Sequence, residues 1–251
     1  MLEPVVVTLA FILGALVQTV AGFGSALVAM PIMSLVISVR TAAPVQVLLG
    51  FLVTLTVLYQ NWHALRWREA ARLIAGSVVG VPLGTLALKS LPADPVMACL
   101  GLVLLGYGLF TLWDARRRQT EYPARTVMAT PVVSWLVGLC SGILGGAYAT
   151  DGPPLIIYGA VKQWPKATLK SILQTCFLVN GVFMVACHGA AGLITREVFR
   201  CCMFGLPGMI LGMAVGSYLD RRVNHERFRK LLLGLILLLG MTLLVRATVS
   251  F

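Results

Sequence analysis

The fold is decided by two glycine-rich stretches, AGFGSALVAMP at residues 21–31 and LGGAYATDGPP at residues 144–154. They lie inside long apolar segments, residues 5–39 and residues 131–161 respectively. One continuous helix over the first segment would measure roughly 50 Å, more than the ~30 Å hydrocarbon core of a bilayer. We therefore expect both segments to break at their glycines into two half-helices.

The two stretches begin two related halves. Superposed by eye, Gly22 matches Gly145. Both halves then carry glycines at every fourth position, which allows two helix backbones to approach closely. These glycines are Gly76, Gly80 and Gly84 in the first half, and Gly208, Gly212 and Gly216 in the second. The sequence predicts two repeats, residues 1–113 and 131–251, joined by a basic linker at residues 114–130. We expect the glycine ridges to pack either between the repeats or between two copies in a homodimer.

The composition places the chain in a lipid bilayer. Of its 251 residues, 59% are hydrophobic and 12% are charged, and the mean hydropathy is +0.91, whereas soluble domains are about a quarter charged. Besides the two glycine-broken segments, the chain has six apolar segments, at residues 43–62, 70–90, 96–113, 167–188, 198–219 and 228–249. We therefore expect an all-α polytopic membrane protein with seven to eight hydrophobic segments.

The net charge of +11 is carried by short loops between the apolar segments. Such charges set membrane topology, so we expect no nucleic-acid partner. If all eight segments crossed the bilayer, ten Lys and Arg would lie on each side. If the two glycine-broken segments are re-entrant, fifteen lie on one side and five on the other, which matches the positive-inside rule. Each repeat then has one broken, re-entrant segment and three spanning helices. The odd number of crossings inverts the second repeat and puts both termini on the periplasmic or extracellular side.

A helix that starts inside the membrane can bind an anion. Its first N–H groups lack partners within the helix, and its dipole places partial positive charge there. Glycine lets a ligand approach the backbone, and proline suits the first turn of the next helix. The expected substrate-binding residues are Gly22, Gly24, Ser25, Gln18, Gly145, Gly146, Ser141, Tyr148, Thr150, Gln46, Gln174, Thr175 and Asn180, with Pro31 and Pro154 as helix-break residues. For each Ser or Thr, a bond to its own helix is the alternative.

Asp151 is the one carboxylate well inside an apolar segment. Ionisable groups at membrane depth are costly and usually functional. Two interpretations remain open: Asp151 caps the helix that follows it, or it couples transport to a proton or sodium ion. We expect no other cofactor and no bound metal, because clustered ligands are absent from the segments. His63 and His188 lie near segment ends, which predicts interfacial positions.

The paired glycine-rich, proline-ended motifs, in a chain of this length, resemble the sulfite exporter TauE/SafE family. The glycine runs are reduced here to Gly22-Phe23-Gly24-Ser25 and Gly145-Gly146-Ala147. The resemblance covers nearly the whole chain. It implies a multi-pass transporter of the bacterial inner membrane that moves sulfite, small organosulfonates and related sulfur compounds, commonly outward.

The sequence therefore predicts a secondary transporter, not an enzyme. The expected substrate is a small anion, sulfite or a short organosulfonate such as sulfoacetate, exported by alternating access about a site near mid-membrane. An anion channel is the alternative, because pores also use broken helices. A membrane thiol-redox carrier using Cys140 and Cys176 is disfavoured, since the matching first-half positions are Val17 and Gly50.

Overall fold

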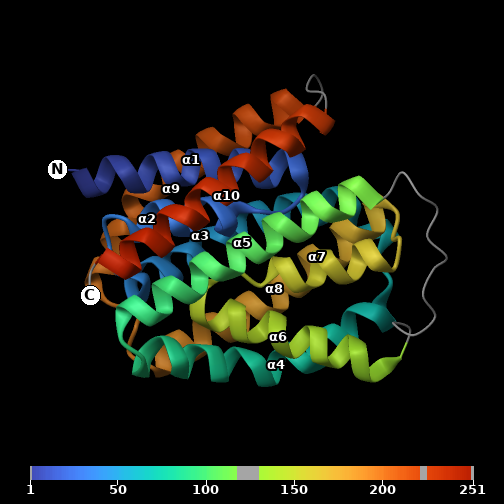
Figure 1. Ribbon diagram of the computed structural model, residues 1–251, viewed down its shortest axis with the longest axis horizontal. Helices are drawn as coiled ribbons and strands as arrows, with labels where there is room; N and C mark the ends of the chain where they lie inside the picture. The colour runs from blue at the N-terminus through green and yellow to red at the C-terminus, as the bar shows by residue number, and fades with distance from the viewer. Residues whose placement is uncertain (1, 118–129, 221–224, 250–251) are drawn as a thin grey trace.

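The computed structural model describes residues 2–117, 130–220 and 225–249, and over these ranges the chain is helical with no strand (Figure 1). The elements are α1 (Leu2–Ala21), α2 (Ser25–Ser34), α3 (Val39–Asn61), the 3-10 turn η1 (Trp62–Ala64), α4 (Trp67–Ser90), α5 (Ala93–Arg117), α6 (Pro131–Tyr148), α7 (Gly152–Val161), α8 (Lys166–Ala190), α9 (Arg196–Asp220) and α10 (His225–Val249). Most of the predicted linker, residues 118–129, lies outside the described residues.

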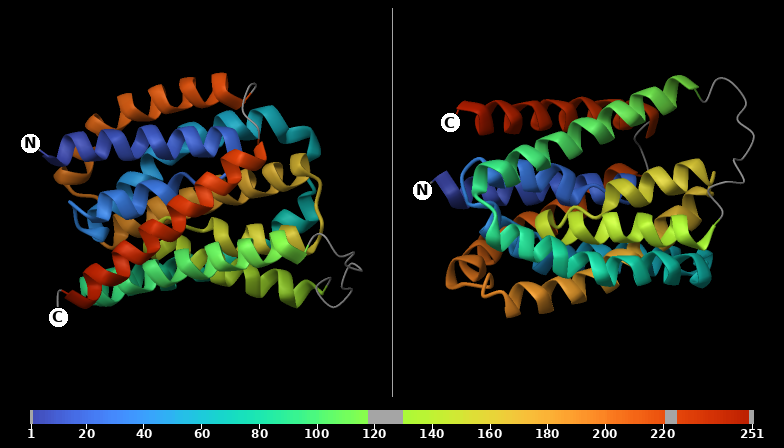
Figure 2. Two further views of the ribbon diagram at one scale, coloured as in Figure 1. Left: turned by 45° about the horizontal axis from the view of Figure 1, so that its top comes forward. Right: turned by 60° about the horizontal axis from the view of Figure 1, so that its bottom comes forward.

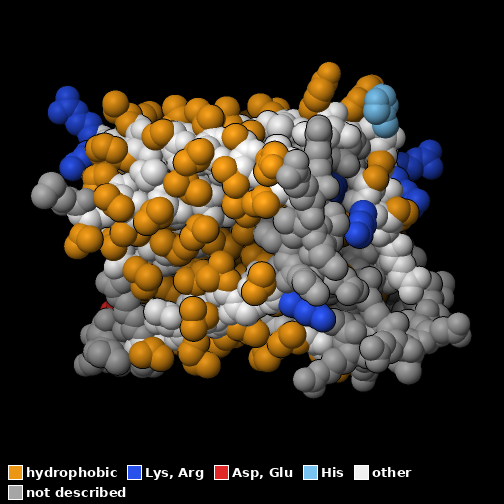
Figure 3. Space-filling model, turned by 90° about the horizontal axis from the view of Figure 1, so that it is seen from above, with side chains coloured by type: hydrophobic (Ala, Val, Ile, Leu, Met, Phe, Trp, Pro, Cys, Tyr) orange, Lys and Arg blue, Asp and Glu red, His pale blue; other side chains and the backbone are white. Residues whose placement is uncertain are grey.

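Seven of the described helices are long and apolar enough to cross a membrane: α1, α3, α4, α5, α6, α8 and α9. Large apolar side chains cover the outside of the bundle, and Lys and Arg lie mainly toward its two ends (Figure 3). An apolar exterior of this kind is stable only in contact with lipid. The prediction of an all-α, multi-pass membrane protein is confirmed.

Both glycine-rich segments break, as predicted, but not into equal halves. The arms before the breaks, α1 and α6, have 20 and 18 residues, whereas α2 and α7 have 10 each. The first break runs through Gly22 and Gly24, whose φ angles of +83° and +102° favour glycine. The second break turns at Ala149, which takes a left-handed φ of +52°. Hydrogen bonds from Ala149 N to Gly145 O and from Thr150 N to Leu144 O close the end of α6.

These boundaries correct the match between the repeats. Because α1 ends at Ala21 and α6 at Tyr148, the structural counterpart of Gly22 is Ala149, four residues beyond Gly145. The predicted role of Pro31 at the start of a helix is also wrong, because Pro31 is the seventh residue of α2. Pro154 does lie in the first turn of α7, as expected. The match of Gly22 with Gly145 is therefore wrong, because Ala149 and not a glycine makes the second turn.

The two hairpins open toward opposite ends of the molecule. In Figure 1, α1 starts at the left, and α2 returns toward that side. Helix α6 starts at the right, and α7 returns toward the right. The short arms α2 and α7 therefore begin deep in the bundle. The N-terminus and the ends that flank residues 118–129 lie at opposite ends of the molecule.

The glycine ridges pack between the repeats, within one chain. Helix α4 packs along α6, and α9 packs along α1 (Figure 2). A Cβ atom on a ridge glycine would overlap the backbone of the facing helix: Gly76, Gly80 and Gly84 face Trp135, Leu139 and Ile143, while Gly208 and Gly212 face Thr8 and Ile12. Each ridge helix thus holds the long arm of the other repeat's hairpin, and these glycine faces are not free for a homodimer.

Candidate functional site

A cavity of about 70 Å³ lies where the two breaks meet. One water needs roughly 10–15 Å³ of such space, so the cavity can hold a small ion of several heavy atoms. Four regions line it: the first break (Gln18, Gly24, Ser25, Ala26, Leu27), α3 (Gln46, Val47, Gly50, Phe51, Thr54), the second break (Ala149, Thr150, Asp151, Gly152) and α8 (Phe177, Gly181, Met184). The structure thus brings six predicted site residues to one cavity: Gln18, Gly24, Ser25, Gln46, Thr150 and Asp151.

Helix α2 points its N-terminus into this cavity. Gly24 occupies the N-cap position without a side chain to cap the helix, and Ser25, Ala26 and Leu27 form the first turn. Their N–H groups have no acceptor within an α-helix. All three residues line the cavity. The α2 end therefore presents hydrogen-bond donors and the positive end of a helix dipole to any occupant.

Two amides extend the donor set of α2. Gln46 Nε2 donates to Ser25 Oγ at 3.0 Å, and Gln46 Oε1 is buried without a partner among the described residues. Gln18 Nε2 lies 3.5 Å from Thr54 Oγ1 and 3.4 Å from Gln174 Oε1. If the Gln46 amide turns over, Ser25 donates to it and its NH₂ group becomes free for a ligand. The cavity is therefore polar and adaptable on the α2 side.

Helix α7 presents different chemistry to the same cavity. Its first turn contains Pro153 and Pro154, which have no N–H group. Asp151 stands at the N-cap position, but its side chain makes no capping hydrogen bond. Asp151 Oδ2 instead accepts from Asn180 Nδ2 at 2.9 Å, and Asp151 O accepts from Ser141 Oγ at 2.8 Å. The capping interpretation is wrong in this geometry. Asp151 is held at the cavity wall and is 6% exposed as a whole residue.

Several predicted residues support the cavity from behind. Asn180, which holds Asp151, is itself bonded by Ser77 Oγ of α4. Gln174 Nε2 donates to Gly22 O at 2.6 Å and so fixes the first break. Of these residues, Ser77 was not expected from the sequence, because a serine beside a glycine ridge gives no signal of its own. This layer of hydrogen bonds orients the groups that line the cavity.

Other predicted residues do not line the cavity. Gly145 and Gly146 belong to the last turn of α6, where a Cβ on Gly146 would overlap Val81 of α4. Tyr148 is buried at the end of α6. Thr175 Oγ1 bonds Ser171 O on its own helix, as the alternative interpretation anticipated. The apolar wall of Val47, Phe51, Phe177 and Met184 was missed, since apolar side chains in a membrane helix are not distinctive.

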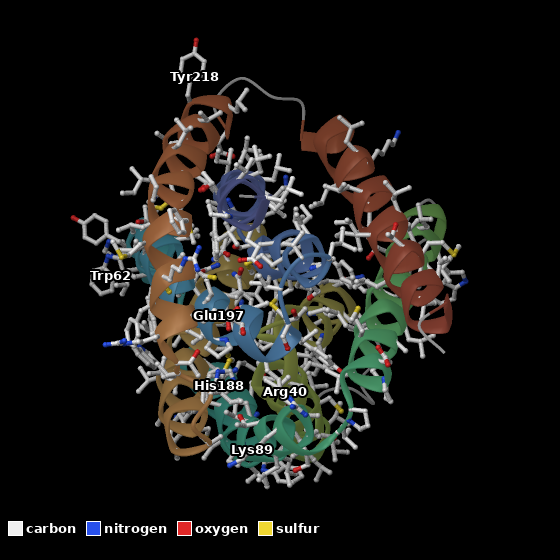
Figure 4. The ribbon with its side chains drawn as sticks, turned by 90° about the vertical axis from the view of Figure 1, so that its left-hand side faces the viewer. Arg40, Trp62, Lys89, His188, Glu197 and Tyr218 are labelled. Carbon is white, nitrogen blue, oxygen red and sulfur yellow. The ribbon has the colours of Figure 1, made fainter. Side chains whose placement is uncertain are left out.

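His188 corrects another expectation. It is fully buried, not interfacial, with its Nε2 2.8 Å from Gly146 O. Figure 4 shows His188 among the helices, whereas Trp62 and Tyr218 point outward. His63, in η1, is exposed as expected. His188 lies near the end of α8, and the packing of α4 and α6 around that end buries it.

The cavity contains no Lys or Arg among its lining residues, so an anion there would be bound through backbone, hydroxyl and amide groups. No group of three metal-ligating side chains occurs within the described residues. Cys140 is exposed and Cys176 is buried, and both are free.

Comparison with known proteins assigns the chain to a family. The model of the family described as sulfite exporter TauE/SafE matches residues 6–243. "Probable inner membrane transporter protein TsaS" of Comamonas testosteroni is 25% identical over 184 residues, covering 73% of this chain and 74% of that protein. "Probable sulfite/organosulfonate exporter TauE" of Cupriavidus necator is 23% identical over 239 residues, covering 93% of this chain and 91% of that protein. No solved structure matches the chain. The family resemblance and the expectation of a transporter instead of an enzyme are confirmed: the chain belongs to the sulfite exporter TauE/SafE family.

Proposed function

We propose that the protein is a secondary carrier that exports sulfite or short organosulfonates such as sulfoacetate by alternating access. The observation that carries the proposal is the N-terminus of α2, aimed into a small cavity with Gln18, Ser25 and Gln46 around it. The name of the Cupriavidus relative, a sulfite/organosulfonate exporter, supports the same substrate class.

The donor arrangement suits an oxyanion with three oxygens in a compact group. The N–H groups of Ser25, Ala26 and Leu27 come from successive residues of one helical turn, and the hydroxyl and amide donors approach from α1, α2 and α3. Hydrogen bonds to a charged group contribute about 1.5–3 kcal/mol each, net of the water they replace. A few such bonds bind a desolvated anion without a buried cation, whose own desolvation would be costly.

The apolar wall favours a short organic tail as well as bare sulfite. Phe51, Phe177 and Met184 line the same cavity as the polar side chains of α1 and α2. A methylene or two of a sulfonate would bury apolar area there, at roughly 0.8 kcal/mol per CH₂ group. The small cavity volume limits the tail to a few atoms.

Asp151 is the proposed coupling residue. A carboxylate and a bound anion repel each other when they share a cavity of low dielectric. A proton on Asp151, or a sodium ion beside it, removes this repulsion. Occupancy of the anion site then depends on occupancy of the cation site, which is the requirement for coupled transport.

Alternating access would use the two hairpins. We propose that the repeats are inverted, so that the end carrying residues 62–66 and 162–165 is cytoplasmic and both termini are periplasmic. Carriers built from inverted repeats bind substrate near the bilayer midplane, where their helices are discontinuous, and rock one bundle against the other. The α1–α9 and α4–α6 pairs, each formed between repeats, are the packed units that would move.

A transport assay in proteoliposomes tests the proposal. We expect saturable efflux of labelled sulfite and sulfoacetate, driven by a proton or sodium gradient, and thermal stabilisation of the purified protein by the same anions. Acetate and chloride at equal concentration serve as controls. Single-channel currents would support the channel alternative, and absence of sulfite or sulfonate flux in folded protein would overturn the proposed substrate class.

A further inference from the structure

Lys170 lies against the first helix break. It belongs to the second turn of α8, and a Cβ atom built on Gly22 would come within 2.6–2.8 Å of three of its side-chain carbons. Gly22 also has a φ of +83°, which residues with a side chain rarely adopt. The glycine therefore serves two purposes: it permits the turn, and it leaves room for the lysine stem to lie flat across it.

Three lysines near the α7–α8 connection differ in their surroundings. Lys162 Nζ lies 3.7 Å from Glu69 Oε1 and 5.3 Å from the centre of the Tyr158 ring. Lys166 is exposed at the first position of α8. Lys170 is partly buried, and no ion pair links it to a carboxylate within residues 2–117, 130–220 and 225–249. Its charge is therefore available to a mobile anion.

Gln174 connects Lys170 to the cavity. It lies one turn further along the same face of α8. Its Nε2 donates to Gly22 O at 2.6 Å, and its Oε1 accepts from Gln18 Nε2 at 3.4 Å. Gln18 lines the cavity. A line of groups thus leads from a partly exposed lysine, across the first break, to the donors of the candidate site.

We propose that Lys170 is the residue that receives the substrate anion on its way from the α7–α8 end of the molecule to the cavity. This inference rests on the proposed function and names the entry side of the same site. The sulfite or sulfonate group contacts the ammonium group first and then exchanges it for the donors of Gln18 and α2.

Membrane topology explains a lysine at this end of the molecule but not its placement. The positive-inside rule is satisfied by a cation anywhere in the loops. Lys170 instead carries its apolar stem across Gly22, as long cationic side chains do at an apolar boundary. An anion that loses water at this boundary is stabilised by a cation there, so the barrier to entry falls.

The test compares Lys170→Met with Lys166→Met in proteoliposomes, using labelled sulfite and sulfoacetate. Lys170→Met keeps an apolar stem over Gly22 and removes the charge, while Lys166→Met removes the same charge one turn nearer the end of the molecule. We expect Lys170→Met to raise the half-saturation concentration about tenfold, as for loss of one charge-assisted contact. Its dependence on ionic strength should also weaken. Lys170→Arg and Lys166→Met should behave as the wild type.

Size-exclusion profiles and thermal unfolding of each variant check the fold, and Lys170→Gln provides a second neutral variant if Lys170→Met does not fold. Equal half-saturation values for the Lys170 and Lys166 variants would overturn the role of Lys170 while leaving the proposed function intact. So would a fall in maximal rate alone. A folded wild-type protein that moves neither anion would overturn the proposed function, and the role of Lys170 with it.

Discussion

The two helix breaks share a left-handed turn and differ in chemistry. In both, a left-handed residue follows the long arm, Gly22 or Ala149, and a ten-residue helix starts three positions later. At the first break, the new helix offers three N–H groups and a serine hydroxyl. At the second, two prolines remove N–H groups from the corresponding turn, and Asp151 stands where the first break has Gly24.

The two breaks therefore have a turn in common and divide the chemistry between them. The first break presents donors to the cavity. The second presents a carboxylate held by Asn180, while Ser141 donates to the backbone oxygen of Asp151. A site with two donor-rich ends would bind an anion more tightly but would have nothing to couple its release to a cation gradient. The substitutions below either exchange the properties of the two breaks or disturb one of them alone.

The largest expected effect is that of Asp151→Asn. The amide keeps the size of the side chain and can still accept from Asn180, so the protein should fold. It cannot take up a proton or hold a sodium ion as a carboxylate does. We expect gradient-driven efflux to fall at least about a hundredfold, since one charged partner of a buried interaction is lost, while exchange of labelled for unlabelled sulfite persists. Efflux measured with and without each gradient gives the comparison.

Asp94→Asn is the control for that experiment, because Asp94 lies in the first turn of α5, away from the cavity-lining residues. It should leave gradient dependence unchanged. If Asp151→Asn also keeps its full response to the gradients, the carboxylate has a structural role and the division of chemistry between the breaks is wrong.

Ala26→Pro gives the first break a property of the second. Ala26 is the second residue of α2 and corresponds to Pro153 of α7, so proline is tolerated there sterically. The substitution deletes one N–H group that faces the cavity. Loss of one hydrogen bond to a charged ligand costs about 1.5–3 kcal/mol, which corresponds to a rise of roughly 10- to 100-fold in half-saturation concentration. Initial rates at varied sulfite concentration measure it.

The reciprocal change, Pro153→Ala, restores an N–H group to α7. It should leave the half-saturation concentration within about threefold of the wild type, since the anion is expected at α2. A larger response from Pro153→Ala than from Ala26→Pro would place the anion at the second break instead.

The features best predicted from the sequence are those that helix length and backbone spacing constrain most strongly. Helix length against bilayer thickness required two breaks, and glycines at every fourth position required close helix packing. Both features are present in the structure. The four-residue error in matching the repeats arose because Ala149 adopts a conformation that sequence assigns to glycine. Hydrogen bonds at the end of α6 stabilise it there, and the identity of residue 149 alone does not reveal them.

The candidate site was predicted only in part, because a rotation of one helix by a third of a turn decides what lines a cavity. On α8, Gln174 and Asn180 support the cavity, Gly181 lines it, and Thr175 bonds its own helix. From the sequence alone, any of these four residues of α8 could line the cavity. The choice among them depends on how α8 packs against α3 and α4, which is a property of the tertiary structure.

The smallest expected effect concerns the packing behind one break. Gly80→Ala places a methyl group against Leu139 of α6, and such overpacking costs about 1–3 kcal/mol, offset by up to ~1 kcal/mol of helix propensity. A shift of α6 moves Asp151 but not α2. We therefore expect a lower unfolding temperature and a few-fold loss of gradient-driven rate, with an unchanged half-saturation concentration. Gly106→Ala in α5, where a Cβ atom meets nothing within 4 Å, should be neutral or slightly stabilising. If Gly80→Ala instead weakens anion affinity, the two breaks move as one unit, and their chemistry is not separable.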